Sequence, residues 1–224
     1  MPQTCSGDSQ QPTAVKVITQ NTVFTIGHST HQQERFVELL KQHGITALCD
    51  VRSKPYSRMN PQFNREELER TLLAEGIEYR FLGKELGARS DDPSCYENGK
   101  VLYGRLAHTE LFQYGLKRLL RGMKDNHRIA LMCAEKEPLE CHRTLLVARH
   151  LAALGLCIEH IHADGHLENH EAALCRLARM LNVPEDDMFR SREELLAETY
   201  ERQEERIAYD RSHPDGEKTW AAGR

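Results

Sequence analysis

Short apolar runs alternate with longer stretches of helical periodicity between residues 22 and 181. The short runs are rich in β-branched and other apolar residues, which predicts buried strands. The predicted strands cover residues 22–26, 45–51, 77–82, 129–133 and 157–162. The run at 129–133, IALMC, is the most uniformly apolar of them, as expected of a strand covered on both faces.

Apolar residues at helical spacing predict a helix after each strand. The predicted helices cover residues 30–43, 64–76, 104–124, 141–154 and 172–181, and residues 83–103 are expected to form a long loop. Strands that alternate with helices of this length imply right-handed crossovers and a mostly parallel sheet. The predicted fold class is therefore α/β, a three-layer sandwich with a sheet of about five strands.

Charge is unevenly distributed along the chain. Residues 185–224 contain 12 acidic and 7 basic residues, which leaves 22 acidic and 23 basic residues in the other 184. This division predicts a disordered leader at 1–20, a single α/β domain at 21–184 and an acidic tail at 185–224 that contains a charged helix. A nearly neutral domain favours a small anionic ligand or nucleotide over a long nucleic acid.

The cysteine content and the targeting signals bear on the compartment. Seven cysteines, an odd number without a framework spacing, predict reduced thiols. No apolar run approaches the roughly 18 residues that a transmembrane helix needs, so no membrane partner is expected. The first residues lack the basic and apolar regions of a secretory signal, and a cytoplasmic location is expected. Cys49, Cys157 and Cys175 fall on apolar faces and are predicted to be in the core.

Polar residues stand at the ends of four of the predicted strands. Ligands bind beyond the carboxyl ends of the strands in an open parallel sheet, so these residues form a candidate site. They are His28 and Ser29 at the first strand, Asp50 and Arg52 at the second, Cys133 and Glu135 at the fourth, and His162 and Asp164 at the fifth. His28, Asp50 and Glu135 are candidate catalytic groups for proton transfer, and Ser29 and Arg52 are candidate ligand contacts.

The segment CAEKEPLECHR at 133–143 carries the sharpest signal. Cys141 is expected in the first turn of a helix, where amide groups and the helix dipole stabilise a thiolate or a bound anion. His142 and Arg143 would strengthen either role, and Arg143 could contact a phosphate through two N–H groups. Cys133 and Cys141 are therefore candidate catalytic residues, and His142 and Arg143 are candidate ligand contacts.

Other interpretations of the same segment remain open. Cys133 could simply be a packed strand residue, because free cysteine is among the most buried residue types. A metal site formed by two cysteines and a histidine is disfavoured, since C-x7-C-H is not a usual zinc spacing and no CxxC pair accompanies it. We therefore predict no metal ligand.

The segment DVRSKPYSRMNPQF at 50–63 adds basic and aromatic residues to the same region. Lys54 and Arg58 join Arg52 there, interleaved with Tyr56 and Phe63. Basic residues beside aromatic ones are typical of sites that hold phosphates and stack bases. Lys54 and Arg58 are therefore candidate ligand contacts, with a solvated loop as the alternative interpretation.

Familiar signatures of other chemistries are missing from the sequence. It contains no GxxxxGK[ST], no GxGxxG after a strand, no HExxH and no GxSxG, and it identifies no cofactor. The remaining histidines, among them His160 and His170, are expected on helix surfaces or loops in contact with solvent.

Several of these segments together resemble a known family. TIGHS at 25–29, DVRSKPYSR at 50–58, YRFLGKELGAR at 79–89 and CAEKEPLECHR at 133–143 resemble, in this order, the domain-of-unknown-function family 488. The similarity extends over about residues 25–182. It implies a Rossmann-like α/β domain and assigns no reaction. Where the family is expected to carry two glycines, this chain has Lys84 and Glu85.

Three classes of function follow from these observations. The first is an enzyme that acts on a phosphate-bearing small molecule or nucleic acid bound at the rim of the sheet. The second is a thiol-based redox or sulfur-transfer protein that uses Cys133 and Cys141. The third is a non-catalytic binding module. The sequence assigns neither the substrate nor the oligomeric state.

Overall fold

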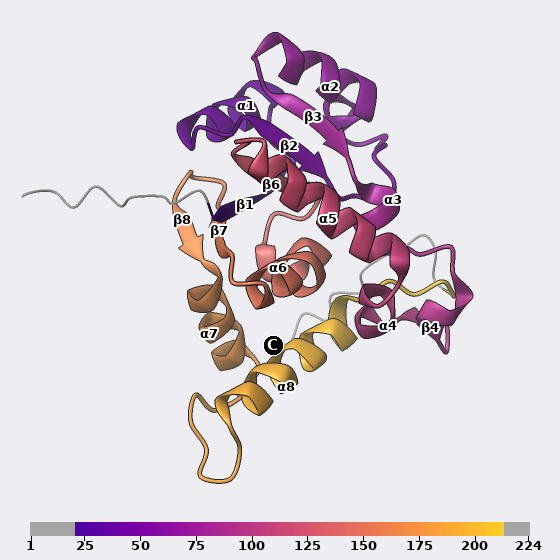
Figure 1. Ribbon diagram of the computed structural model, residues 1–224, viewed down its shortest axis with the longest axis vertical. Coiled ribbons are helices and arrows are strands. Elements are labelled where there is room, and N and C mark those ends of the chain that lie inside the picture. The colour runs from indigo at the N-terminus through magenta and orange to yellow at the C-terminus, as the bar shows by residue number, and fades with distance from the viewer. Residues whose placement is uncertain (1–20, 213–224) are drawn as a thin grey trace, which may run out of the picture.

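The computed structural model describes residues 21–212 and contains an α/β sandwich around one central sheet (Figure 1). The sheet has the order β3-β2-β6-β1-β7-β8. Its strands are β1 (Thr22–Gly27), β2 (Ala47–Asp50), β3 (Glu78–Phe81), β6 (Ile129–Cys133), β7 (Cys157–Ile161) and β8 (Leu167–Asn169). The five predicted strands are confirmed, and all of them run parallel.

The sixth strand was not predicted. β8 pairs antiparallel with β7 across a short turn, in which Gly165 adopts a φ of +96°. A three-residue strand at the edge of a sheet has too few residues to show a period-2 pattern. The predicted leader at 1–20 lies outside the described residues, as does the end of the predicted tail at 213–224.

Helices cover both faces of the sheet. α1 (Gln33–Gln42) and α2 (Arg65–Ala74) pack on one face, against strand residues such as Phe24 and Met132. α5 (Glu110–Lys124), α6 (Arg149–Ala153) and α7 (His170–Met180) pack on the other, against residues such as Val23 and Leu131. Adjacent strand residues alternate between the two cores because side chains on a strand point to opposite faces.

Two predicted helices are divided in the structure. The helix predicted at 104–124 is split into α4 (Tyr103–Ala107) and α5, and the side chain of Thr109 caps α5 by accepting a hydrogen bond from the amide of Phe112. The helix predicted at 141–154 begins with the π-helix Arg143–Ala148, whose six residues are all buried, and continues as α6. Cys141 therefore lies in extended backbone before the helix and not in its first turn.

The predicted loop at 83–103 contains short elements. These are α3 (Gly83–Leu86), a 3₁₀ turn at Pro93–Cys95, and a hairpin of β4 (Tyr96–Glu97) and β5 (Lys100–Val101). Gly83 is required where it stands, because a Cβ there would lie 2.0 Å from the carbonyl oxygen of Arg52. The close approach of this segment to the candidate site is therefore retained although Lys84 and Glu85 replace the expected glycines.

The charged helix predicted in the tail is α8 (Arg192–Ile207), and it packs against the domain. Ser191 and Glu194 form a capping box at its start. The side-chain amide of Gln203 donates to the carbonyl oxygen of Leu139 at 2.8 Å, and Tyr200 is buried under Arg149. Among residues 21–212, no helix is both long enough and apolar enough to span a bilayer.

Two histidines and one cysteine were predicted in the wrong environments. His160 lies on the buried strand β7, where Nδ1 contacts the hydroxyl of Thr25 at 2.7 Å and Nε2 contacts Nδ1 of His170 at 3.1 Å. These contacts satisfy both rings inside the core, where solvent was expected. Cys157 was predicted in the core but is exposed, because it is the first residue of β7 and stands at the edge of the packed region.

Candidate functional site

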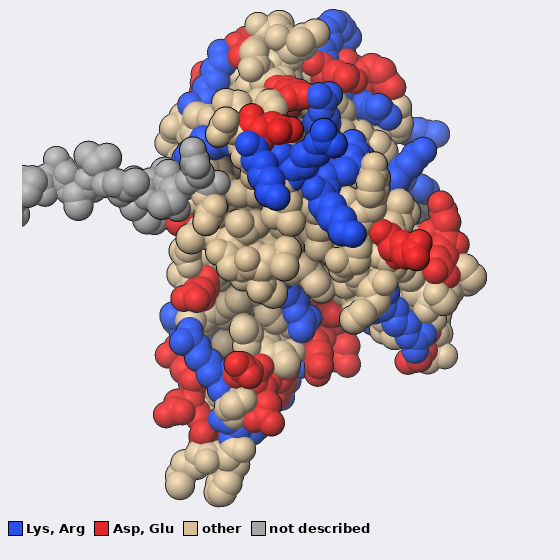
Figure 2. All heavy atoms as spheres, viewed as in Figure 1, with Lys and Arg blue, Asp and Glu red and all other residues tan. Residues whose placement is uncertain are grey.

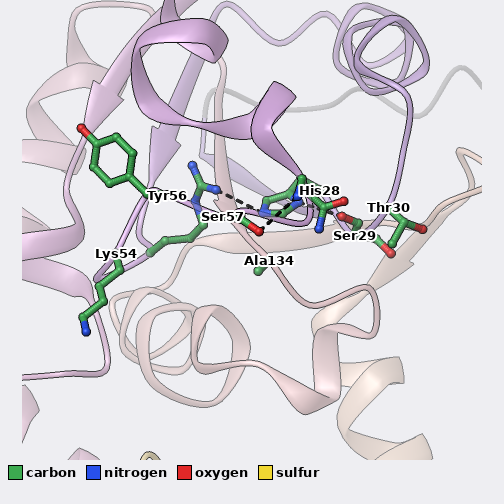
Figure 3. Close-up of a pocket in the computed structure, with 9 residues that line it drawn as sticks. His28, Ser29, Thr30, Lys54, Tyr56, Ser57 and Ala134 are labelled. Atoms are coloured by element: carbon green, nitrogen blue, oxygen red, sulfur yellow. Dashed lines mark hydrogen bonds between the residues drawn. The ribbon is translucent and has the colours of Figure 1, made fainter. Parts of the chain in front are cut away.

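The adjacent strands β1 and β6 are followed by chain segments that leave toward opposite faces of the sheet. β1 leads to α1 on one face, and β6 leads to the π-helix and α6 on the other. Such a divergence opens a crevice at the carboxyl ends of the strands. A pocket of about 300 Å³ lies there (Figure 3). Its lining residues follow β1, β2 and β6: His28, Ser29, Thr30, Arg52, Lys54, Tyr56, Ser57, Asn60 and Ala134.

Asp50 and Arg52 form a buried ion pair beneath the pocket. Asp50 is fully buried, and it accepts hydrogen bonds from Nε and Nη2 of Arg52 and from the hydroxyl of Tyr79 at 2.7 Å. Arg52 also donates to the carbonyl oxygen of Phe63 and to His28. These contacts use four of the five N–H groups of a guanidinium, and one hydrogen on Nη1 remains for a ligand. Asp50 is thus occupied in holding Arg52 and has no oxygen directed to the pocket.

His28 is held as a neutral ring between two partners. Nδ1 must donate to the carbonyl oxygen of Ser29 at 2.9 Å, so Nε2 accepts from Nη1 of Arg52 at 3.1 Å. Burial, followed by the charge of Arg52, lowers the pKa of His28 to about 4. The ring of Phe63 stacks on it with centroids 4.4 Å apart. The imidazole ring of His28 therefore lines the pocket while both of its nitrogens are hydrogen-bonded within the protein (Figure 3).

Two serines line the pocket, one on strained backbone and one in a turn. Ser29 has a φ of +49°, in the left-handed region that residues other than Gly, Asn and Asp seldom adopt. The hydroxyl of Ser57 accepts hydrogen bonds from the amides of Met59 and Asn60, which leaves its own hydrogen to donate. Asn64, at the start of α2, holds the amide of Ser57 at 2.7 Å.

The loop after β6 is clamped between Gly27 and Arg143. A Cβ at Gly27 would lie 1.9 Å from the carbonyl oxygen of Glu135, so only glycine fits there. Arg143 is almost fully buried and donates to the carbonyl oxygens of Glu135 at 2.8 Å and Lys136 at 3.3 Å. The guanidinium predicted to hold an anion is therefore used to position the backbone beside the pocket.

Cys133, Cys141 and His142 form a buried cluster on the α6 side of the sheet. Nδ1 of His142 lies 3.6 Å from Sγ of Cys133 and 3.9 Å from Sγ of Cys141. Sγ of Cys141 also contacts Oε2 of Glu135 at 3.0 Å and the amide of Arg143 at 3.4 Å. The exposed fractions of Cys133 and Cys141 are 3% and 1%, and neither lines the pocket.

The cluster has strongly shifted ionisation. Burial raises the pKa of Cys141, but a hydrogen bond from the Cys133 thiol and the nearby Arg143 and His142 outweigh it and lower that pKa to about 6. Burial raises the pKa of Cys133 well above its usual value. Burial also acts to raise the pKa of Glu135, yet the charge of His142 and hydrogen bonds from both thiols lower it to about 2. The ionisation of these three side chains is therefore governed by their mutual hydrogen bonds as well as by burial.

The basic residues of the 50–63 segment are not all at the pocket. Lys54 and Tyr56 line it, and Figure 3 shows their side chains diverging at one side of the His28 and Ser57 group. Arg58 is exposed and does not line it. The pocket therefore brings together His28, Ser29, Arg52 and Lys54 from the predicted set. The two thiols, Arg143, His162 and Asp164 do not line it.

Some residues of the site gave little sequence signal. Tyr79 holds Asp50 from β3, Phe63 stacks on His28, and Gly27 admits the loop after β6. Gly27 ends the first predicted strand, so a close backbone approach there could have been suspected. The roles of Tyr79 and Phe63 depend on which strands are neighbours, and that order is not visible in the local pattern.

A second basic region lies outside the pocket. Figure 2 shows lysine and arginine side chains gathered over the position of α5. The exposed basic residues of that helix are Lys117, Arg118, Arg121 and Lys124, and Arg118 pairs with Glu85. None of these four residues lines the pocket.

Comparison with known families places the chain. The model of the family described as "Domain of unknown function DUF488" matches residues 32–150, more than half of the chain. The chain belongs to this family. The DUF488 match is shorter than the resemblance expected over 25–182, and it contains the 50–58 and 133–143 segments but not His28 and Ser29. Comparisons with curated proteins and with solved structures gave no significant match.

Proposed function

We propose that the protein binds a small phosphate-bearing molecule, of mononucleotide size or smaller, in the pocket beyond β1, β2 and β6. The observation that carries this proposal is the position of the pocket at the point where the chain leaves β1 and β6 toward opposite faces. That position is the common ligand site of open α/β sheets. Its volume of about 300 Å³ is at the lower end of small-molecule sites.

The donors that line the pocket support an anionic ligand. Arg52 has one N–H to spare, Ser57 has its hydroxyl hydrogen to donate, and Lys54 adds a charge at the edge. The nine lining residues include no carboxylate, so nothing in the lining repels a phosphate. Charge-assisted hydrogen bonds of this type are the strong ones.

The ring of Tyr56 favours a ligand with a flat group beside the phosphate. Its side chain is 56% exposed, and its hydroxyl donates to Glu66 at 2.7 Å, which fixes one end of the ring. An exposed aromatic face stabilises a stacked base by about 1–3 kcal/mol. A nucleotide would therefore place its phosphate against Arg52 and its base against Tyr56.

The geometry gives less support to thiol chemistry on a bound substrate. A substrate in the pocket contacts neither Cys133 nor Cys141, because both thiols are buried behind the residues that line it. Asp50 is also unavailable as a base, since its oxygens are held by Arg52 and Tyr79. Binding, and not a reaction at these groups, is what the arrangement supports best.

Isothermal titration calorimetry with inorganic phosphate, pyrophosphate, AMP and ADP tests the proposal. We expect saturable binding of at least one of them. The Lys54→Ala variant should bind roughly 10-fold more weakly, because it loses one charge-assisted contact. Lys124→Ala, which removes an exposed lysine of α5, is the matched control and should leave the affinity unchanged. Absence of binding by all four compounds, or equal losses in both variants, would contradict the proposal.

A further inference from the structure

We propose that Cys133, Cys141 and His142 bind one zinc ion. Sγ of each cysteine and a ring nitrogen of the histidine lie within 4.8 Å of one another. Cys133 ends β6, whereas Cys141 and His142 immediately precede the π-helix. This site is separate from the proposed phosphate pocket, and neither proposal depends on the other.

The distances in the cluster agree with the edges of a tetrahedral zinc site. With Zn–S bonds of about 2.3 Å and a Zn–N bond of about 2.1 Å, the S···N edge of a tetrahedron is about 3.6 Å. Nδ1 of His142 lies 3.6 Å from one sulfur and 3.9 Å from the other. Both S···N distances are therefore within a few tenths of an ångström of those in a tetrahedral site, and the two sulfurs lie within 4.8 Å of each other.

His142 is already oriented as a metal ligand. A carbonyl oxygen can only accept, so the contact of 2.9 Å to the carbonyl of Val51 places the hydrogen on Nε2. Nδ1 then presents its lone pair to the two sulfurs when the ring is neutral. A histidine that binds zinc usually donates its other N–H to a carbonyl or carboxylate in this way, which fixes the tautomer and the ring plane.

The surroundings also suit a zinc thiolate site. Two thiolates neutralise the charge of the zinc ion, so the buried group carries no net charge from these ligands. The amide of Arg143 donates to Sγ of Cys141 at 3.4 Å, a contact that supports a thiolate ligand. Glu135 is partly exposed and lies 3.0 Å from the same sulfur, and a water molecule can complete the fourth position of the zinc ion.

The unusual spacing of the ligands has a structural cause. A short zinc loop normally brings two cysteines together within a few residues, whereas seven residues separate Cys133 from Cys141 here. The intervening segment includes a 3₁₀ turn at Pro138–Glu140, and Arg143 donates to the carbonyl oxygens of Glu135 and Lys136. This fold returns Cys141 to the end of β6, which a rule based on spacing alone does not anticipate.

Two measurements on the full chain test the zinc site without any substitution. Protein purified from zinc-supplemented medium should contain one zinc per chain by elemental analysis. X-ray absorption should then show two sulfur ligands at about 2.3 Å and one nitrogen at about 2.0 Å. A chain without zinc that also fails to take up added zinc or cobalt, or that carries a Cys133–Cys141 disulfide under reducing purification, would overturn the proposal.

Substitutions assign the ion to these residues. Cobalt titration of the metal-free chain should give the sulfur-to-metal charge-transfer band of a thiolate site. In Cys133→Ser, Cys141→Ser and His142→Gln, the affinity should fall by at least about 100-fold. Cys175→Ser, a partly exposed cysteine on α7, is the matched control and should behave as the unsubstituted chain. Binding that survives in all three variants contradicts the assignment, whether or not each variant is fully stable.

Discussion

Replacing Asp50 by asparagine tests the ion pair that supports the pocket floor. The carboxylate is fully buried and accepts from Nε and Nη2 of Arg52 and from the hydroxyl of Tyr79. In Asp50→Asn, the amide nitrogen would face two donors, and the buried guanidinium would lose its counter-charge. Arg52 is only 5% exposed, so water cannot replace the lost partner.

The cost of that change can be worked out from the burial of the pair. Removing one partner of a buried ion pair typically costs about 3–5 kcal/mol, because an uncompensated charge remains in the interior. The lost contact with Tyr79 acts in the same direction. Urea denaturation followed by circular dichroism should therefore show a free energy of unfolding lower by about 3–5 kcal/mol.

An exposed ion pair provides the control for this experiment. Arg179 and Glu185 pair at 3.0 Å, with side chains 67% and 64% exposed. The Glu185→Gln variant should lower the free energy of unfolding by less than about 1 kcal/mol. If Asp50→Asn costs no more than Glu185→Gln, the reasoning that Asp50 acts mainly by holding Arg52 is refuted.

Three further predictions concern the end of β1 and the two residues that follow it. His28 has a pKa of about 4 in the folded state, against about 6.5 in the unfolded state. Between these two pH values only the unfolded state binds the proton. The free energy of unfolding should therefore fall by up to about 3 kcal/mol as the pH is lowered from about 6.5 to about 4. His28→Gln should flatten that part of a denaturation profile measured against pH, and an unchanged slope would contradict the assignment. Gly27→Ala should lower the free energy of unfolding by about 1–3 kcal/mol, because its Cβ meets the carbonyl of Glu135; unchanged stability in urea would show that this approach is not tight. Ser29→Val should be less stable than Ser29→Asn by about 1–2 kcal/mol, since asparagine tolerates a φ of +49° and valine does not; thermal unfolding that ranks them equally would rule out backbone strain there.

The fold was predictable because its strands are strongly apolar. The runs IALMC at 129–133 and TVFTI at 22–26 are short and consist mainly of apolar or β-branched residues, which predicts buried strands. Both are central strands of the sheet. β8 escaped prediction because its residues, Leu167–Asn169, are half-buried and follow no alternating pattern. The break before α5 depends on Thr109, which caps that helix, and a single threonine within a helical pattern does not by itself predict a break.

The candidate site was predictable as a location but not as a set of contacts. Strand ends placed His28, Ser29 and Arg52 at one rim, and these residues do line one pocket. The sequence could not show that Arg143 turns to the loop after β6, because that depends on how the 134–140 segment folds back. Spacing also argued against a metal at Cys133, whereas the folded distances favour one.

The most direct test of the central claim is an NMR titration that locates the phosphate ligand. The amides of isotope-labelled protein would be followed as the tightest-binding compound of the calorimetry series is added. The largest shifts should lie at residues 28–30, 52–54, 56–60 and 134, which line the pocket or adjoin its lining. Shifts confined to the basic residues of α5, or no shifts at saturating ligand, would contradict the claim that the pocket beyond β1, β2 and β6 is the binding site.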